Sequence, residues 1–266
     1  IVNAQVRFIA GRDLGMKEDH IVYHLMQKAT RDSVKTARED ILRHPGIESL
    51  AAASHLPSQI VSWIGNLDWA GRPAGEEPLC GFLSVDPGFV DTLGLTVIRG
   101  RNFSWDRPAD MESFLVNETA VRQLGLTEPV GTELRFWGHK GPIIGVVKDF
   151  TNRHIAKETA PLIMAAGSWG SNKSYLFLRL KGSDPTGALR HFQDVWKKHN
   201  PGFPAEYRFL DETIDEMYAA EKRLLKIILS FAGLAVLISC LGLVGLSSFM
   251  AEEKTKEIGI RKVLGA

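Results

Sequence analysis

The longest apolar stretch of the chain covers residues 227–251 and contains no charged residue. As a helix, a stretch of this length would extend over about 37 Å, more than the ~30 Å hydrocarbon core of a bilayer. Core helices of soluble proteins are usually shorter and keep a polar face. The pattern therefore predicts a transmembrane helix, with an unusually apolar core helix as the alternative. Four basic residues on each side leave its orientation undecided.

Small side chains recur within this segment, and in lipid they allow a second helix to approach closely. The predicted packing positions are Gly233, Ala235, Ser239, Gly242 and Gly245. The alternative is that Gly and Ala are simply frequent in membrane helices.

Upstream, strand-like alternation and helix-like periodicity follow one another. Strands over 20–27 and 47–54 flank a helix over 30–43, and strands over 175–180 and 206–210 flank a helix over 185–199. Between these two β-α-β units lie short predicted strands over 78–85, 113–116, 131–137, 142–150 and 161–166, with helices over 86–94 and 117–124. Because no strong breaker follows residue 211, we expect one long helix from about 212 to 251. The sequence therefore predicts a mixed α/β fold.

Composition narrows the class of protein. The 266 residues carry 32 basic and 31 acidic side chains, and this near balance argues against a nucleic-acid partner. With only Cys80 and Cys240, a disulfide framework is excluded. The chain starts at Ile1 without an initiator Met, and we expect it to be an excerpt of a longer protein.

The search for catalytic chemistry predicts neither an enzyme nor a cofactor or metal site. Residues 182–189 have the glycine spacing of a phosphate loop but lack its Lys and Ser/Thr. His20 and His24 are interpreted as solvated surface side chains, and Asp149 as an ordinary residue at a strand end. Trp63 and Trp69 are expected in a loop, either exposed for a substrate or partner, or packed in the core.

Residues 252–266 predict a short amphipathic helix beyond the span. Such a helix lies along a membrane surface or docks into a groove on a soluble partner.

The motifs LISCLGLVGLSSF and KTKEIGIRKVLGA at the C-terminal end resemble the FtsX-like permeases of the MacB-type ABC transporter family. Upstream, FIAGRDLG (8–15), SVDPGFVDTLGLTVIRGRNFS (84–104), LVNETAVRQLG (115–125), IIGVVKDF (143–150) and EYRFLD (206–211) are similar to the extracytoplasmic core domain of that family. The resemblance covers nearly the whole chain.

This resemblance implies a division of the chain. Residues 1–226 would form the extracytoplasmic domain, residues 227–251 the transmembrane helix and residues 252–266 the cytoplasmic coupling helix. Within the domain, a porter-like part would comprise 1–77 and 171–211, an inserted β-rich part 78–170 and a stalk 212–226. The location would be a bacterial cytoplasmic (inner) membrane.

The resemblance also implies a role for the last segment, which would touch a cytosolic ABC-type ATPase. The coupling residues would be Glu257, Ile258, Gly259, Ile260, Arg261, Lys262, Leu264 and Gly265. ATP hydrolysis would then move the stalk and the external domain to export a substrate. The alternative is that the same movement regulates a cell-envelope hydrolase or relays a signal. Further implied partners are the lipid bilayer, a second permease half or a homodimer, and a periplasmic adaptor or envelope protein.

Overall fold

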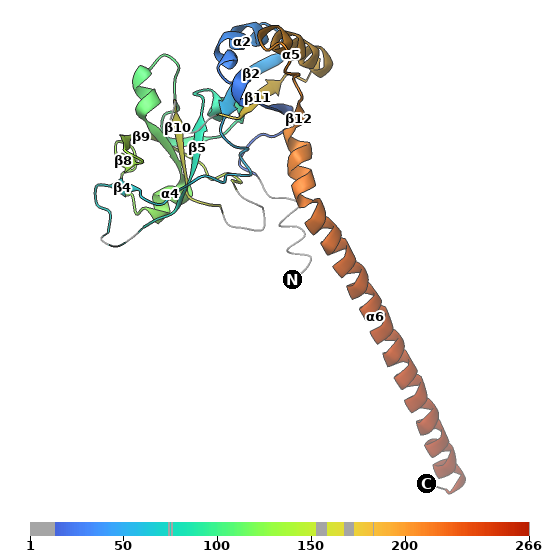
Figure 1. Ribbon diagram of the computed structural model, residues 1–266. Coiled ribbons are helices and arrows are strands. Elements are labelled where there is room, and N and C mark those ends of the chain that lie inside the picture. Colours follow the sequence, from blue (N-terminus) through green and yellow to red (C-terminus); the bar gives the residue numbers. More distant parts are fainter. Residues whose placement is uncertain are drawn as a thin grey trace. The chain divides into compact units, whose positions relative to one another are not determined.

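The computed structural model describes residues 14–73, 75, 77–152, 159–167, 173–182 and 184–265 (Figure 1). It divides into two units, Ile1–Met217 and Tyr218–Ala266. All strands of the described residues belong to the first unit, and the second contains the larger part of helix α6.

Four strands of the first unit form a sheet in which strands from the two predicted β-α-β motifs alternate. The strands are β1 (Ile21–Leu25), β2 (Ile47–Ala53), β11 (Tyr175–Leu180) and β12 (Arg208–Phe209). They lie in the order β12-β1-β11-β2, and each neighbouring pair is antiparallel. The N-terminal β-α-β motif therefore contributes β1 and β2 with β11 between them, and the C-terminal motif contributes β11 and β12 with β1 between them. This is a split β-α-β arrangement.

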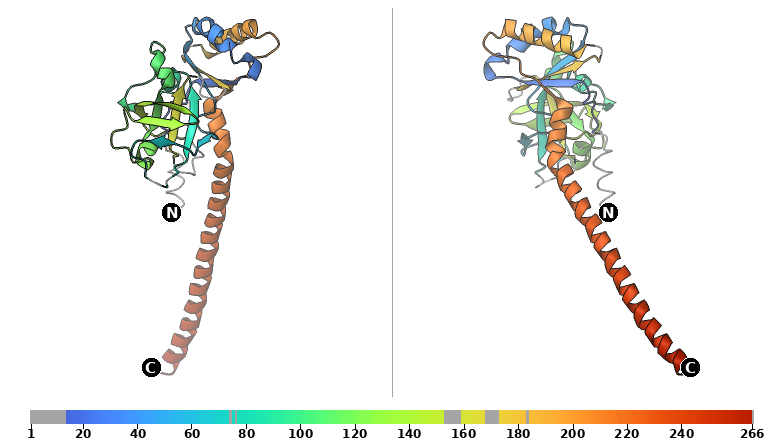
Figure 2. Two further views of the ribbon diagram at one scale, coloured as in Figure 1. Left: turned by 60° about the vertical axis from the view of Figure 1, so that its left-hand side comes forward. Right: turned by 90° about the vertical axis from the view of Figure 1, so that its right-hand side faces the viewer.

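Two helices cover one face of these strands. Figure 2 shows α2 (Ser33–Leu42) and α5 (Pro185–His199) side by side in both views. Apolar residues recur along one side of each helix, as expected for a helix that packs on a sheet. The shared core contains Val34, Ala37 and Ile41 from α2, Ala188, Leu189, Phe192, Val195 and Trp196 from α5, and Val22, Leu50, Leu176 and Leu178 from the sheet. Pro185 occupies the first turn of α5, and the Asp184 carboxylate accepts a hydrogen bond from the Gly187 N–H at 2.9 Å.

The remaining strands continue the sheet through a single residue pair, Ala53 with Val85. Their order is β5-β10-β7-β9-β8-β4, with β3 on β5 and β6 on β9. The elements are β3 (Trp63–Ile64), β4 (Asp68–Trp69), β5 (Cys80–Val85), β6 (Val97–Gly100), β7 (Phe114–Asn117), β8 (Glu133–Phe136), β9 (His139–Val147), β10 (Leu162–Ala166), α3 (Phe89–Thr92) and α4 (Glu118–Gln123), together with the 3-10 turns η1 (Lys28–Thr30) and η2 (Pro108–Glu112). A second core, which includes Phe82, Phe114 and Phe136, fills this part.

The predicted α/β class is confirmed, and the structure corrects three details of the expected elements. Strands β3 and β4 precede the predicted boundary at residue 78, yet they pair with β5 and β8 and therefore belong with the β-rich part. The hairpin link between β8 and β9 has two residues rather than four. Trp137 and Gly138 both have positive φ, at 50° and 78°, as a type I′ turn requires.

The third correction concerns the helix predicted over 86–94, which begins only at Phe89, so that Asp86 is not part of it. Gly88 occupies the cap of α3. The Asp86 carboxylate accepts a hydrogen bond from the Ala52 N–H at 3.1 Å and forms an ion pair with Lys173. Asp86 therefore fixes the end of β2, where the two cores meet.

Helix α6 (Leu210–Val263) is longer than the sequence predicts. The predicted helix ended at residue 251, with a separate short helix beyond it. Instead α6 continues to Val263, and Gly265 then takes a left-handed conformation with φ +77°. Glycine is the usual residue just past a helix end, because it has no Cβ to oppose this conformation.

Candidate functional site: the root of α6 and the residues beyond it

The first two turns of α6 are built into the first unit. Leu210 is completely buried, and Ile214 and Thr213 are 5% and 6% exposed. Strand β12, which directly precedes α6, pairs with β1 in the middle of the split β-α-β sheet. We call residues 210–217 the root of α6.

Hydrogen bonds add direct links between the root and the sheet. The Thr213 hydroxyl donates to the Phe209 carbonyl at 3.0 Å. Its single proton is thereby used, so the Tyr23 hydroxyl, 3.0 Å from Thr213 Oγ1, must be the donor of that hydrogen bond. Tyr23 lies on β1, and a rotation of the root would strain this bond.

Met217 and Glu216 provide further contacts on the outside of the root. The Gln59 amide and the Ser58 hydroxyl donate to the Met217 sulfur at 3.2 and 3.7 Å. Arg208 and Glu216 form an exposed ion pair at 2.5 Å. Since exposed ion pairs contribute little, the buried apolar side chains and the Tyr23 hydrogen bond hold most of the root.

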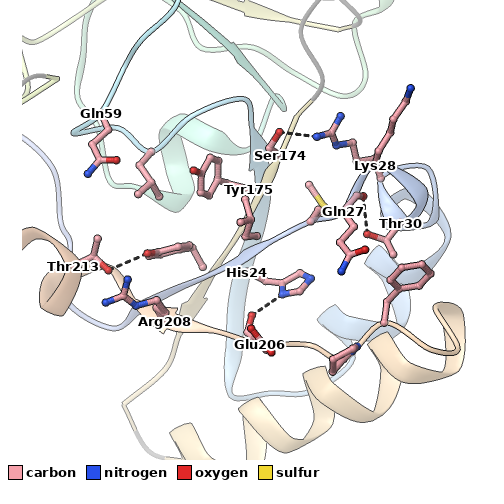
Figure 3. Close-up of a pocket in the computed structure, with 17 residues that line it drawn as sticks. His24, Gln27, Lys28, Thr30, Gln59, Ser174, Tyr175, Glu206, Arg208 and Thr213 are labelled. Atoms are coloured by element: carbon pink, nitrogen blue, oxygen red, sulfur yellow. Dashed lines mark hydrogen bonds between the residues drawn. The ribbon is translucent and has the colours of Figure 1, made fainter.

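A cavity of about 720 Å³ lies beside the root, around the end of β1 (Figure 3). In Figure 3, Tyr175, Gln59 and Thr213 lie on one side of β1, and Gln27, Thr30 and Lys28 lie toward the other. Apolar residues such as Leu56 and Phe203 complete the lining.

His24 lies between the cavity and the core, which corrects the prediction that it is a solvated surface residue. It is 5% exposed, and its ring packs edge-on against Trp196 with centroids 4.6 Å apart. Burial lowers the pKa of His24. The Nδ1 atom is 2.6 Å from the Glu206 carbonyl, which only accepts, so the neutral ring carries its proton on Nδ1. His24 thus ties β1 to the segment that leads into β12.

Asp149 has a structural role, which agrees with its interpretation as an ordinary residue at a strand end. Its carboxylate accepts hydrogen bonds from the Thr119 N–H at 2.9 Å and the Thr119 hydroxyl at 2.7 Å, and it pairs with Arg122. In return, Glu118 accepts a hydrogen bond from the Asp149 N–H. These bonds fasten the start of α4 to the end of β9. Among the described residues, no group of His, Cys, Asp or Glu is arranged to hold a metal.

The structure separates the two tryptophans that were expected together in a loop. Trp69 is in β4, 6% exposed and part of the second core, so core packing is the correct interpretation for this residue. Trp63 is in β3 and half-buried. Its predicted role in contacting a partner stays a prediction.

Residues Lys226–Ala251 of α6 are long and apolar enough to cross a membrane, and none of this segment is buried within the chain. At about 100° per residue, Ala235, Ser239, Gly242 and Gly245 fall on one side of the helix. Gly233 is nine positions before Gly242 and therefore lies about 180° away. The Ser239 hydroxyl donates to the Ala235 carbonyl at 2.8 Å, so it needs no outside partner in lipid.

The predicted coupling residues occupy the end of α6 and the turn that follows. Ile258, Ile260 and Leu264 are 63%, 61% and 79% exposed. Gly259 is open, since a Cβ there would meet nothing within 4 Å. Arg261, Lys262 and Gly265 lie in the same exposed segment, whereas the side chain of Glu257 is outside the described residues.

The residues of the root were missed by sequence reasoning. Tyr23 and Thr213 are 190 residues apart, and no local pattern marks the hydrogen bond between them. The only available signal was the apolar spacing of Leu210 and Ile214 at the start of a long helix.

No family model matches this chain. An uncharacterized ABC transporter permease of Bacillus subtilis (strain 168), YknZ, is 26% identical over 192 residues, which are 68% of this chain and 48% of that protein. The chain therefore spans about half the length of this curated relative.

Among solved structures, the periplasmic region of MacB from Actinobacillus actinomycetemcomitans has a TM-score of 0.52 at 16% identity, over 76% of this chain and 94% of that region. The extracellular domain of the noncanonic ABC-type transporter YknZ from Gram-positive bacteria has a TM-score of 0.48 at 17% identity, over 71% and 97%. The likeness to MacB shows the fold. With the permease relative, it confirms the resemblance to the MacB/FtsX-like ABC transporter permeases that the sequence motifs indicated.

Proposed function

We propose that this chain is the part of an ABC transporter permease that carries motion between a cytosolic ATPase and an extracytoplasmic domain. In this proposal residues 1–226 lie outside the cytoplasmic membrane, residues 227–251 cross it, and residues 252–266 meet the ATPase. The motion serves to export a substrate.

The observation that carries the proposal is the continuity of α6. A single helix includes the root, the apolar segment and most of the predicted coupling residues. A helix transmits displacement along its axis because its hydrogen bonds are all internal. The root joins the first turns of α6 to β12 and β1, so movement of the root would reach the sheet.

The stripe of Ala235, Ser239, Gly242 and Gly245 supports a second part of the proposal, which is that another membrane helix packs here. That helix would come from a second permease half, either a further copy or another segment of the parent protein. Because burial of apolar surface gives no driving force inside lipid, close contact at small residues is what stabilises such a pair.

The test uses the parent permease reconstituted with its ATPase in nanodiscs. Gly259→Trp and Arg261→Glu should lower ATPase activity several-fold, because they alter the shape and charge of the coupling segment. Arg190→Glu, on the exposed side of α5, is the matched control and should leave the activity unchanged.

Further readouts separate coupling from folding. The tryptophan fluorescence of the first unit should be the same in wild type, Arg261→Glu and Arg190→Glu, and limited proteolysis of the first unit should be unchanged in Gly259→Trp, which adds a tryptophan of its own. Deletion of residues 252–266 should abolish co-purification of the ATPase. Wild-type ATPase activity in both coupling variants, or co-purification that survives the deletion, would contradict the proposal.

A further inference from the structure

A second cavity, of about 700 Å³, lies on the far side of Met26 and Arg31 from the cavity at the root. Helix α2 forms one wall. The turn at Asp86 and Pro87, together with Trp105 and Met111, forms the opposite wall. The cavity therefore lies where the two cores of the first unit meet.

Basic side chains face this cavity in a regular row, one from the residue between η1 and the cap of α2 and two from α2 itself. Arg31, Lys35 and Arg38 all line it, at spacings of four and three residues that place them on one side of the helix. Val34, Ala37 and Ile41 pack into the core, which fixes the rotation of α2.

The charges in the cavity do not cancel. Its described lining contains four basic residues against the two carboxylates of Asp32 and Asp86. The basic residues are Arg31, Lys35, Arg38 and Lys173. The Asp86 carboxylate is already used by its ion pair with Lys173 and its hydrogen bond from the Ala52 N–H. Asp86 also acts on Arg38 electrostatically, but together with the exposed Asp32 it leaves the described lining with two positive charges in excess.

The two arginines are partly desolvated and make their hydrogen bonds to neutral groups. Arg38 donates to the Leu50 carbonyl at 2.8 Å, and its guanidinium carbon lies 4.8 Å from the centre of the Trp105 ring. Burial lowers the pKa of Arg38, which means that its charge loses solvation. Arg31 donates to the Ser174 hydroxyl at 2.9 Å, and within the described part of the chain its buried Nε has no hydrogen-bond partner.

The wall opposite the arginines is apolar and partly open. Trp105 is 50% exposed although it lies over Arg38, and Pro87 and Met111 line the cavity next to it. A flat apolar group can therefore contact Trp105 while an attached anion reaches the basic row. Aromatic stacking and charge-assisted hydrogen bonds act together in such an arrangement.

We propose that this cavity binds a soluble amphipathic anion, in which a carboxylate, sulfonate or phosphate contacts Arg31, Lys35 and Arg38 and an aromatic or other apolar part packs on Trp105. The anion replaces the solvation that the arginines lose through burial. It also contacts both parts of the first unit, because α2 belongs to the split β-α-β sheet and Trp105 to the β-rich part. This inference does not depend on the proposed coupling to an ATPase.

The test is isothermal titration calorimetry on the full chain in phosphatidylcholine nanodiscs, with naphthalene-2-sulfonate as the probe and empty nanodiscs as the blank. Lys35→Glu should weaken binding by about tenfold or more, since a charge-assisted contact is replaced by repulsion. Lys197→Glu makes the same change of charge at an exposed site on α5 and should leave the affinity unaltered.

Further titrations define which chemical groups of the ligand are needed for binding. Trp105→Leu should weaken binding of naphthalene-2-sulfonate but not of inorganic phosphate, and the uncharged 2-naphthol should bind less tightly than the sulfonate in the wild-type chain. A phospholipid headgroup offers the same anionic chemistry, so the titration is repeated with phosphatidylglycerol in the nanodiscs. Retained binding supports a soluble anion, and loss of binding would assign the cavity to the lipid instead.

Equal weakening by Lys35→Glu and Lys197→Glu would overturn the proposal, because it would show a general effect of net charge. Equal affinity for the sulfonate and 2-naphthol would overturn it as well.

Discussion

Phe192 in α5 and Phe231 in α6 are residues of the same type, but the two helices that carry them have opposite environments. Phe192 is completely buried between α2 and the sheet, whereas Phe231 is 68% exposed. The helix around Phe192 is amphipathic, and its neighbours within the chain cover its apolar side. The segment around Phe231 is apolar on all sides, and none of the residues that the structure describes covers it. The first unit therefore supplies its own apolar interior, while the second depends on the lipid that its composition implies.

The largest difference in stability should appear when each of these two phenylalanines is truncated in turn. Phe192→Ala should lower the free energy of unfolding of the first unit by about 3–5 kcal/mol, because it leaves a cavity in a close-packed core. Phe231→Ala should leave this free energy unchanged. Urea titration in nanodiscs, followed by tryptophan fluorescence, measures the difference, because all six tryptophans precede residue 200. Similar losses for both variants would show that the two environments are not as different as described.

An ion pair with a buried carboxylate in the first unit gives the next largest effect on stability. Asp110 is completely buried and accepts two hydrogen bonds of 2.7 Å from Arg101 and one of 2.9 Å from the Ser104 N–H. Asp110→Asn should destabilise the first unit by about 3 kcal/mol, because it removes the charged partner of Arg101. The exposed pair of Glu133 and Arg135 is the control, and Glu133→Gln should change the stability little.

The same pair predicts how stability depends on pH. Arg101 lowers the pKa of Asp110 below its ordinary value, which is about 3.9 in an unfolded chain. The contribution of Asp110 is therefore complete above about pH 4 and is lost as the pH falls through the lowered value. Unfolding curves recorded from pH 7 to pH 2 should converge for wild type and Asp110→Asn at the acidic end. Curves that stay equally far apart at every pH would contradict this assignment.

A smaller effect on stability is expected at the root of α6, which is the last part of the first unit. Tyr23→Phe removes the hydroxyl that donates to Thr213 and should destabilise the first unit by about 1 kcal/mol. In the reconstituted permease, the same variant should also lower ATPase stimulation if the root carries motion. Tyr207→Phe, on the segment that leads into β12, is the control for loss of a tyrosine hydroxyl.

The smallest effect on the first unit should come from the stripe of small residues in α6. Gly242→Ile should reduce cross-linking to a neighbouring membrane helix, while the stability of the first unit stays the same. Gly233→Ile adds the same bulk on the opposite side of the helix and should leave cross-linking intact. Equal yields for the two variants would remove the evidence for packing along this stripe.

Local patterns predicted most elements but not how they combine. The helices over 185–199 and 117–124 were predicted to within one residue at each end, because apolar periodicity and capping residues are local signals. The interlocking of β1 with β11 was not predicted, since it depends on pairing across 150 residues. Strands β3 and β4 have two residues each, which is too short for alternation to show.

The part of the candidate site that could be predicted is the apolar segment of α6, because composition alone identifies such a segment. The uncharged stretch indicated a membrane segment, and the structure has a helix there that is long and apolar enough to cross a membrane. Packing along its small residues stays a prediction. The burial of His24 was not predictable, because the rings of Phe192 and Trp196 that cover it come from a helix near the other end of the first unit. The continuation of α6 to Val263 was also missed, since charged residues after residue 251 were interpreted as the start of a separate helix.

The split sheet has a consequence for how the chain is made. Strands β1 and β2 leave the ribosome early, but β11, which lies between them, follows only after the whole β-rich part, since Leu25 pairs with Tyr175. At roughly 5–20 residues per second, the gap stays open for about 8 to 30 s of synthesis. Two apolar strands with unpaired edges are exposed throughout that interval, which makes them the natural place for a chaperone to bind during biogenesis.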